Sequence, residues 1–143
     1  MGATHTVCGN AAEVVTAIET ITEEKRVDLV VEAVGKEETL NLAIKLLRRN
    51  GTLLSFGLPH KYEYKLALHE FFWNEGRLIC SLGPTVEDFR IAVDLIANKR
   101  IDVSPLITHT FPFSGAQEAF TLFANRSDGV IKVVLNCDSA RRP

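Results

Sequence analysis

The chain has 143 residues, 46% of them hydrophobic and 24% charged, which is typical of one folded domain and not of a disordered chain. With 16 basic and 18 acidic residues its net charge is -2, so nothing favours electrostatic binding to nucleic acid or to an anionic membrane. No stretch approaches the roughly 20 apolar residues of a membrane helix, and the first residues lack the pattern of a signal peptide. We expect a cytoplasmic protein.

The first third of the chain predicts a strand, a helix and a second strand. Residues 5–8 form a short strand candidate. Asn10 is suited to cap the helix that follows, and Glu13 stands three residues later, as in a capping box; the apolar spacing carries this helix to about residue 24. Residues 27–34 (VDLVVEAV) are apolar on both faces, as in a parallel strand that is covered on both sides. Within that run the carboxylate of Glu32 needs a hydrogen-bond partner.

The middle third continues the alternation of helices and strands. Apolar spacing predicts a helix that ends at Asn50 and Gly51, with these residues on its buried face: Leu40, Ala43, Ile44 and Leu47. A buried strand is expected at residues 52–56, a short helix at 66–73 and a further strand at 77–82. The polar connection at residues 60–65 (HKYEYK) has an open role.

The last third predicts a capped helix and a strand–helix–strand unit. Thr85 is suited to cap a long helix, and residues 107–113 are expected to be extended after a break at Ser104. Ser114 is expected to cap the next helix in a capping box, and residues 130–135 form the last strand. Strands that alternate with helices of these lengths predict an α/β fold with a parallel sheet.

Six segments occur in one order: GATH, DLVVEAVG, GTLLSFGLP, EGRLICSLG, SPLITHTFPF and DGVIKVVLN. This ordered set, from residue 2 to residue 136, resembles the C-terminal half of medium-chain dehydrogenases/reductases, above all the zinc-dependent alcohol, polyol and threonine dehydrogenases. The resemblance implies a truncated Rossmann-like parallel sheet with flanking helices that lacks the first two strands of the full fold. Residues 1–103 would then be a partial dinucleotide-binding domain, residues 104–136 a segment that returns toward the catalytic domain, and residues 137–143 a loose tail.

The resemblance also implies NAD or NADP as the cofactor. Loops at the carboxyl ends of two central strands, where ligands of parallel sheets bind, would face the nicotinamide and its ribose: Ala33, Val34, Gly35, Phe56, Gly57 and Leu58. Lys132 matches a basic residue near the pyrophosphate. Without the resemblance, Gly35 and Gly57 are more simply turn residues that end strands, and Lys132 is a solvent-facing residue of a half-buried strand.

Two parts of the family's machinery have no counterpart in the sequence. No G-x-G-x-x-G occurs, the turn that brings a pyrophosphate to a helix N-terminus. The four histidines are scattered and lack the spacing of metal ligands, so we read them as surface or loop residues: His5, His60, His69 and His109. Zinc polarises the alcohol in this family, so we expect no catalytic or metal-ligating residue, weak or absent NAD binding, and no turnover by the isolated chain. The residues that select the substrate and distinguish NAD from NADP in this family belong to the part of the fold that has no counterpart in the sequence.

The cysteines and the sheet edges complete the expectations. Cys8, Cys80 and Cys137 are widely spaced and odd in number, typical of reduced thiols, and Cys80 reads as a small core residue. Without the first two strands, residues 27–34 become an apolar sheet edge that is prone to pair with another chain. We expect residues 5–8 to pair beside them, and the chain also to form a homodimer, as relatives do through the strand at residues 77–82.

Three functions are consistent with these features. The first is the partial nicotinamide-cofactor domain of a zinc-dependent alcohol or polyol dehydrogenase, in which other residues supply the metal. The second is a non-catalytic α/β binding or dimerisation module. The third is a nucleotide-binding protein that holds a phosphate at the helix after Gly35; it ranks last because Glu37 and Glu38 in that first turn compete with an anion.

Overall fold

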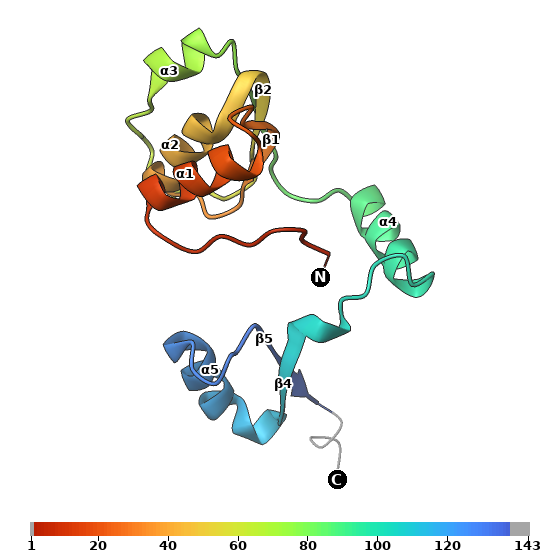
Figure 1. The fold of residues 1–143 in the computed structure, drawn as a ribbon. Coiled ribbons are helices and arrows are strands. Elements are labelled where there is room, and N and C mark those ends of the chain that lie inside the picture. The colour runs from red at the N-terminus through yellow and green to blue at the C-terminus, as the bar shows by residue number, and fades with distance from the viewer. Residues whose placement is uncertain (1, 138–143) are drawn as a thin grey trace. The chain divides into compact units, whose positions relative to one another are not determined.

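The computed structural model describes residues 2–137, and residue contacts divide them into two compact units, the first Gly2–Gly83 and the second beginning at Pro84. Each unit has its own parallel sheet, of three strands in the first and two in the second, with helices beside it (Figure 1). The predicted α/β class with parallel strands is confirmed. None of the helices within residues 2–137 is long and apolar enough to cross a membrane.

The first unit alternates helices and strands in this order: α1 (Ala11–Ile21), β1 (Val27–Glu32), α2 (Glu37–Leu46), β2 (Leu47–Ser55), α3 (Leu68–Trp73) and β3 (Arg77–Cys80). The sheet order is β1-β2-β3, so β1 and β3 are its two edges among the described residues. The capping box at the start of α1 is confirmed. The Asn10 side chain accepts the Glu13 N–H at 3.1 Å, and the Glu13 carboxylate accepts the Asn10 N–H at 2.8 Å.

The core of this unit lies between α2 and one face of the sheet. Its buried residues are Leu40, Ala43, Ile44, Leu47 and Leu53, and Val30, Tyr64, Ala67 and Phe71 pack against them. The opposite face carries Leu29 and Val31 at 56% and 53% exposure. The expectation of a strand covered on both sides is therefore not met among the described residues, where β1 buries one face against α2 and leaves the other open.

The expected pairing of residues 5–8 with β1 is wrong. These residues form no strand and are exposed, and the only strand paired with β1 within residues 2–137 is β2. Val7 is the one large apolar side chain among residues 5–8, so the apolar surface that pairing would bury is too small to offset the entropy lost by ordering the segment. The helix α1 contacts α2 (Figure 1).

The boundary between α2 and β2 also differs from the prediction. The helix ends at Leu46, and Leu47 is fully buried as the first residue of β2. The left-handed residue is Asn50, with φ of 61°, inside the strand and not at a helix end. Its N–H donates to the carbonyl oxygen of Asn74 at 2.7 Å, so a tertiary contact supports a conformation that local spacing assigns to a helix cap.

The second unit contains α4 (Val86–Ala97), β4 (Ile107–Pro112), α5 (Ala116–Asn125) and β5 (Lys132–Asn136), with β4 and β5 paired in parallel. The Thr85 cap is confirmed, since its hydroxyl accepts the Asp88 N–H at 3.2 Å. The Ser114 cap is wrong: residues Phe113–Gly115 form a 3-10 turn, and the cap residue Gly115 offers no side chain. Of the expected tail, Cys137 has no regular structure and residues 138–143 lie outside the described residues.

Candidate functional site

Two loops meet at the carboxyl ends of β1 and β2. The β1 loop comprises residues 33–36 and the β2 loop residues 56–67. Because β1 and β2 are parallel neighbours, their carboxyl ends lie at the same edge of the sheet. The N–H groups of Phe56 and Gly57 both donate to the carbonyl oxygen of Glu32, each at 2.8 Å, so the β2 loop is fixed to the end of β1 from its first residue.

Gly35 and Gly57 bring the two loops into backbone contact. A Cβ atom on Gly57 would lie 2.2 Å from the amide nitrogen of Gly35, and one on Gly35 would lie 2.0 Å from the carbonyl oxygen of Leu58. Gly35 also has φ of +79°, a region that side-chain-bearing residues rarely adopt. The contact between the loops is therefore sufficient reason for glycine at both positions, and the cofactor-facing role of these residues stays a prediction.

The predicted cofactor-facing residues gather around this contact. Val34, Phe56 and Leu58 are 51%, 61% and 70% exposed, and Ala33 is exposed beside them. The backbone of Val34 lies against Gly57, because a Cβ there would approach the Val34 nitrogen to 2.6 Å. The sequence-predicted residues of both loops thus lie at the carboxyl edge of the sheet, the place where ligands of parallel sheets bind, and their apolar side chains are exposed there.

Glu32 has the partner that its burial requires. Its side chain is nearly fully buried, and its carboxylate accepts N–H groups from Val34 at 2.8 Å and Gly35 at 2.9 Å and the Thr39 hydroxyl at 2.7 Å. Burial raises the pKa of Glu32, but the hydrogen bonds from Thr39, Gly35 and Val34 together lower it further, so its pKa lies below the ordinary 4.5. The carboxylate thereby occupies the amides just before α2 that a phosphate would need.

Tyr64 is a residue that the sequence reasoning missed. Its hydroxyl donates to the carbonyl oxygen of Gly35 at 2.5 Å and accepts the His60 N–H at 2.7 Å, so it joins the two loops. The polar run at residues 60–65 gave no reason to single it out. A usable signal was the aromatic ring itself, because a tyrosine in a polar connection often places its ring in a core and its hydroxyl at the rim.

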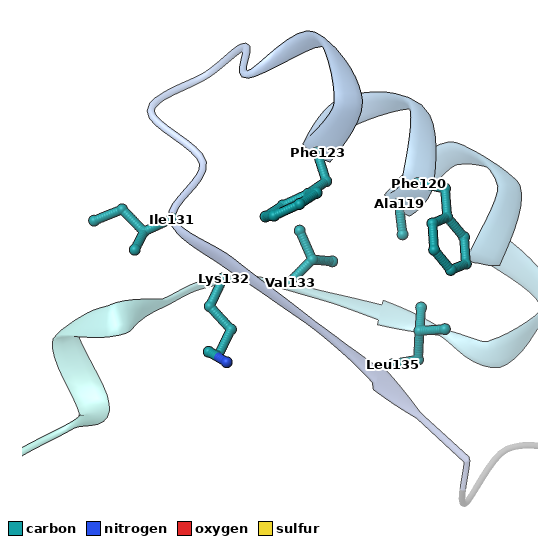
Figure 2. Close-up of a pocket in the computed structure, with 7 residues that line it drawn as sticks. All are labelled: Ala119, Phe120, Phe123, Ile131, Lys132, Val133 and Leu135. Carbon is teal, nitrogen blue, oxygen red and sulfur yellow. The ribbon is translucent and has the colours of Figure 1, made fainter. Parts of the chain in front are cut away.

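Lys132 lies in the other unit, at the start of β5. It is exposed, and the β5 backbone there accepts the Thr108 hydroxyl at 3.3 Å. Figure 2 shows Val133 pointing toward Phe123 and Leu135 toward Phe120, both on α5, while Lys132 points away from that helix. These residues line an apolar pocket of about 290 Å³. The solvent-facing position fits the simpler interpretation, and contact with a pyrophosphate stays a prediction.

Histidines and cysteines form no metal site within residues 2–137, where no group of three His, Cys, Asp or Glu side chains is arranged to hold an ion. His109 departs from its expected surface or loop position: it lies half-buried in β4, 3.2 Å from Asp128. Cys80 departs from its predicted core position and is exposed, because it lies on the edge strand β3, whose four residues are all exposed.

A parallel sheet with flanking helices and glycine loops at its carboxyl edge defines an α/β protein of the Rossmann-like class. Residues 1–98 match the family of zinc-binding dehydrogenases, and the chain belongs to this family. The predicted resemblance to zinc-type dehydrogenases is therefore confirmed.

Two curated relatives illustrate the match. The chain is 29% identical over 140 residues to an alcohol dehydrogenase from Cupriavidus necator, covering 94% of this chain and 37% of that protein. It is 33% identical over 115 residues to sorbitol dehydrogenase from Gallus gallus, covering 78% of this chain and 30% of that enzyme. The chain thus spans about a third of the length of these relatives.

Solved structures of dehydrogenases have a similar fold. Zinc-dependent alcohol dehydrogenase 2 from Streptococcus pneumonia, in its apo form, has a TM-score of 0.84 at 25% identity, covering 96% of this chain and 39% of that one. A short chain alcohol dehydrogenase from E. coli, complexed with NADH, has a TM-score of 0.80 at 20% identity, covering 95% of this chain and 39% of that one. The second likeness shows the fold alone.

Proposed function

We propose that this chain forms the nicotinamide-facing part of the cofactor site in an NAD- or NADP-dependent dehydrogenase of alcohols or polyols. The observation that carries the proposal is that Val34, Phe56 and Leu58 expose apolar side chains on two loops whose backbones meet at the carboxyl edge of the sheet. A nicotinamide ring is planar and largely apolar, so it gains from burial against such side chains. The alcohol and sorbitol dehydrogenases among the relatives support this substrate class.

The described residues fit the nicotinamide end of a dinucleotide and not its phosphates. The amides of Val34 and Gly35 before α2 donate to Glu32, and none of the nine glycines is part of a G-x-G-x-x-G. A carboxylate in this position repels an anion, which weighs against the hypothesis of a phosphate at α2. Lys132 is the one predicted pyrophosphate contact. We therefore expect the chain by itself to bind NADH weakly.

The described residues do not fit the family's catalytic zinc, since residues 2–137 hold no suitable ligand group. The metal would supply the polarisation of the alcohol oxygen in the parent activity. No proton or hydride step is assigned to this chain, whose part is to bind and orient the cofactor. We expect no alcohol oxidation by the isolated chain with NAD and zinc.

The test is a nuclear magnetic resonance titration of the isotope-labelled chain with nicotinamide mononucleotide, with adenosine monophosphate as the matched control. The mononucleotide should shift the amides of Gly35, Gly57 and Leu58, and the adenosine ligand should leave them in place. Shifts of equal size with both ligands, or none with the mononucleotide at high concentration, contradict the proposal.

A second candidate function, self-association, is favoured by the edge strand β3. Its residues Leu78 and Ile79 are 47% and 52% exposed, and an apolar edge offers unpaired backbone groups to a second copy. Sedimentation of the chain tests the dimer, which a strictly monomeric species would rule out.

We also propose that the protein is cytoplasmic, because its three free, exposed cysteines suit a reducing compartment.

A further inference from the structure

Tyr64 connects the core of the first unit to the contact between the two loops. Its ring packs against the buried cluster of α2 and β2, and its hydroxyl meets Gly35 and His60. The three groups form a closed set, because the His60 N–H also lies 3.3 Å from the Gly35 carbonyl oxygen. The Tyr64 hydroxyl thus bonds a residue 29 positions away in the chain, in addition to the direct backbone bond between the two loops.

The segment that carries Tyr64 is fixed along α2. The Lys65 N–H donates to the Glu37 carboxylate at 3.0 Å. The Asn41 side chain donates to the Lys65 carbonyl oxygen at 2.8 Å and accepts the Ala67 N–H at 2.7 Å. Glu37 and Asn41 are one helical turn apart, so they share a face of α2. The polar connection is therefore held to the helix by specific hydrogen bonds, and Tyr64 has a defined position.

Gly35 needs such an anchor. Glycine has access to more backbone conformations than any other residue, and the φ of +79° at Gly35 is only one of them. Its N–H is held by Glu32, and its carbonyl oxygen accepts the Tyr64 hydroxyl at 2.5 Å and, at the longer distance of 3.3 Å, the His60 N–H. The hydroxyl therefore fixes the direction of the peptide group that follows the exposed side chain of Val34.

We propose that Tyr64 is a positioning residue, which sets the spacing of the two nicotinamide-facing loops through the Gly35 carbonyl and the His60 amide. The inference rests on the proposed function, because the loops matter only if they face a cofactor. Tyr64 acts through Gly35 and Val34 on one side and through the β2 loop on the other. Its hydroxyl is satisfied within the protein and is not available to a ligand.

The experiment compares Tyr64→Phe with Tyr62→Phe. The first change removes the hydroxyl and keeps the ring; the second makes the same change at a fully exposed tyrosine two residues away. Tyr64→Phe should speed amide hydrogen exchange at His60 and Gly57 and weaken nicotinamide mononucleotide binding about fivefold, the effect of one neutral hydrogen bond. Tyr62→Phe should change neither.

Asn10→Ala is the control for stability. It removes the side-chain cap of α1, which lies outside both loops and outside the segment that carries Tyr64, so it should lower the melting temperature and leave mononucleotide affinity unchanged. An unchanged affinity in Tyr64→Phe, whatever its melting temperature, overturns the positioning role. An equal loss of affinity in Asn10→Ala overturns it too, because a general loss of stability would then explain both.

The outcomes separate this inference from the proposed function. If the wild-type chain binds no mononucleotide, the proposed function fails, while the exchange rates in Tyr64→Phe and Tyr62→Phe still decide whether the hydroxyl couples the loops. If Tyr64→Phe does not fold, the wild-type chain decides: bound mononucleotide should slow exchange at the His60 amide, and an unchanged rate contradicts the coupling.

Discussion

The carboxylate of Glu32 accepts the N–H of Gly35 through both of its oxygens, at 2.9 and 3.1 Å. This interaction places a buried negative charge under the loop contact and connects the end of β1 to the start of α2. Glu32 also accepts the Val34 N–H and the Thr39 hydroxyl, so its carboxylate binds groups on both sides of the turn from strand to helix.

Replacing the carboxylate should therefore destabilise the first unit. Glu32→Gln places an amide NH₂ among groups that are all donors, and we expect a loss of about 1–3 kcal/mol in the free energy of unfolding. Glu38→Gln is the matched control, because Glu38 is an exposed acid in the first turn of α2. Urea denaturation measures both variants, and equal stability of Glu32→Gln and wild type would refute the role of this charge.

The same carboxylate predicts a pH dependence. The pKa of Glu32 is lowered in the folded protein from 4.5, so its stabilisation is complete above that value and is lost as the pH falls through the lower, folded-state pKa. The free energy of unfolding should therefore decrease from about pH 5 downward, and it should decrease less steeply in Glu32→Gln. Identical slopes in the two proteins would contradict this assignment.

Gly57→Ala tests the close approach of the loops. The new Cβ would lie 2.2 Å from the Gly35 nitrogen, and backbone on both sides would have to move, at a cost of at least about 2 kcal/mol. Gly83→Ala is the control, because Gly83 has φ of +63° with nothing near its Cβ position and should lose only about 1 kcal/mol through backbone strain. Thermal unfolding compares them; an equal or smaller loss in Gly57→Ala would show that the loops yield easily.

Ile79→Lys tests self-association through β3. A lysine on an edge strand opposes pairing with a second chain, so the variant should sediment as a monomer at concentrations where the wild-type chain is a dimer. Val93→Lys serves as control, because it places the same lysine at an exposed apolar position of α4, outside the sheet edge. A dimer that persists in Ile79→Lys, or one that is lost equally in Val93→Lys, excludes this edge as the interface.

Local signals predicted much of the fold. The caps at Asn10 and Thr85 depend on side chains that reach their own helix starts, so a short stretch of sequence contains the whole interaction. The Ser114 cap failed because a 3-10 turn already occupies its place. Asn50 takes its left-handed conformation in contact with Asn74, a partner that no local pattern reveals.

Part of the candidate site could also be predicted from the sequence. The carboxyl ends of two parallel strands must meet, so the loops at Gly35 and Gly57 could be placed together from the sequence. Tyr64 could not be placed there, because its hydrogen bond to Gly35 depends on the path that the loop at residues 56–67 takes along α2. Local sequence patterns do not predict that path. Cys80 was misplaced since apolar character alone does not reveal that a strand lies at a sheet edge.

The most direct test asks which end of the cofactor touches the chain. Saturation-transfer difference spectroscopy of NADH with the isolated protein reports the ligand protons that lie against it. We predict stronger transfer to the nicotinamide ring than to the adenine, and a further decrease at the nicotinamide in Tyr64→Phe. Transfer dominated by the adenine, or equal transfer at both rings, would contradict the account.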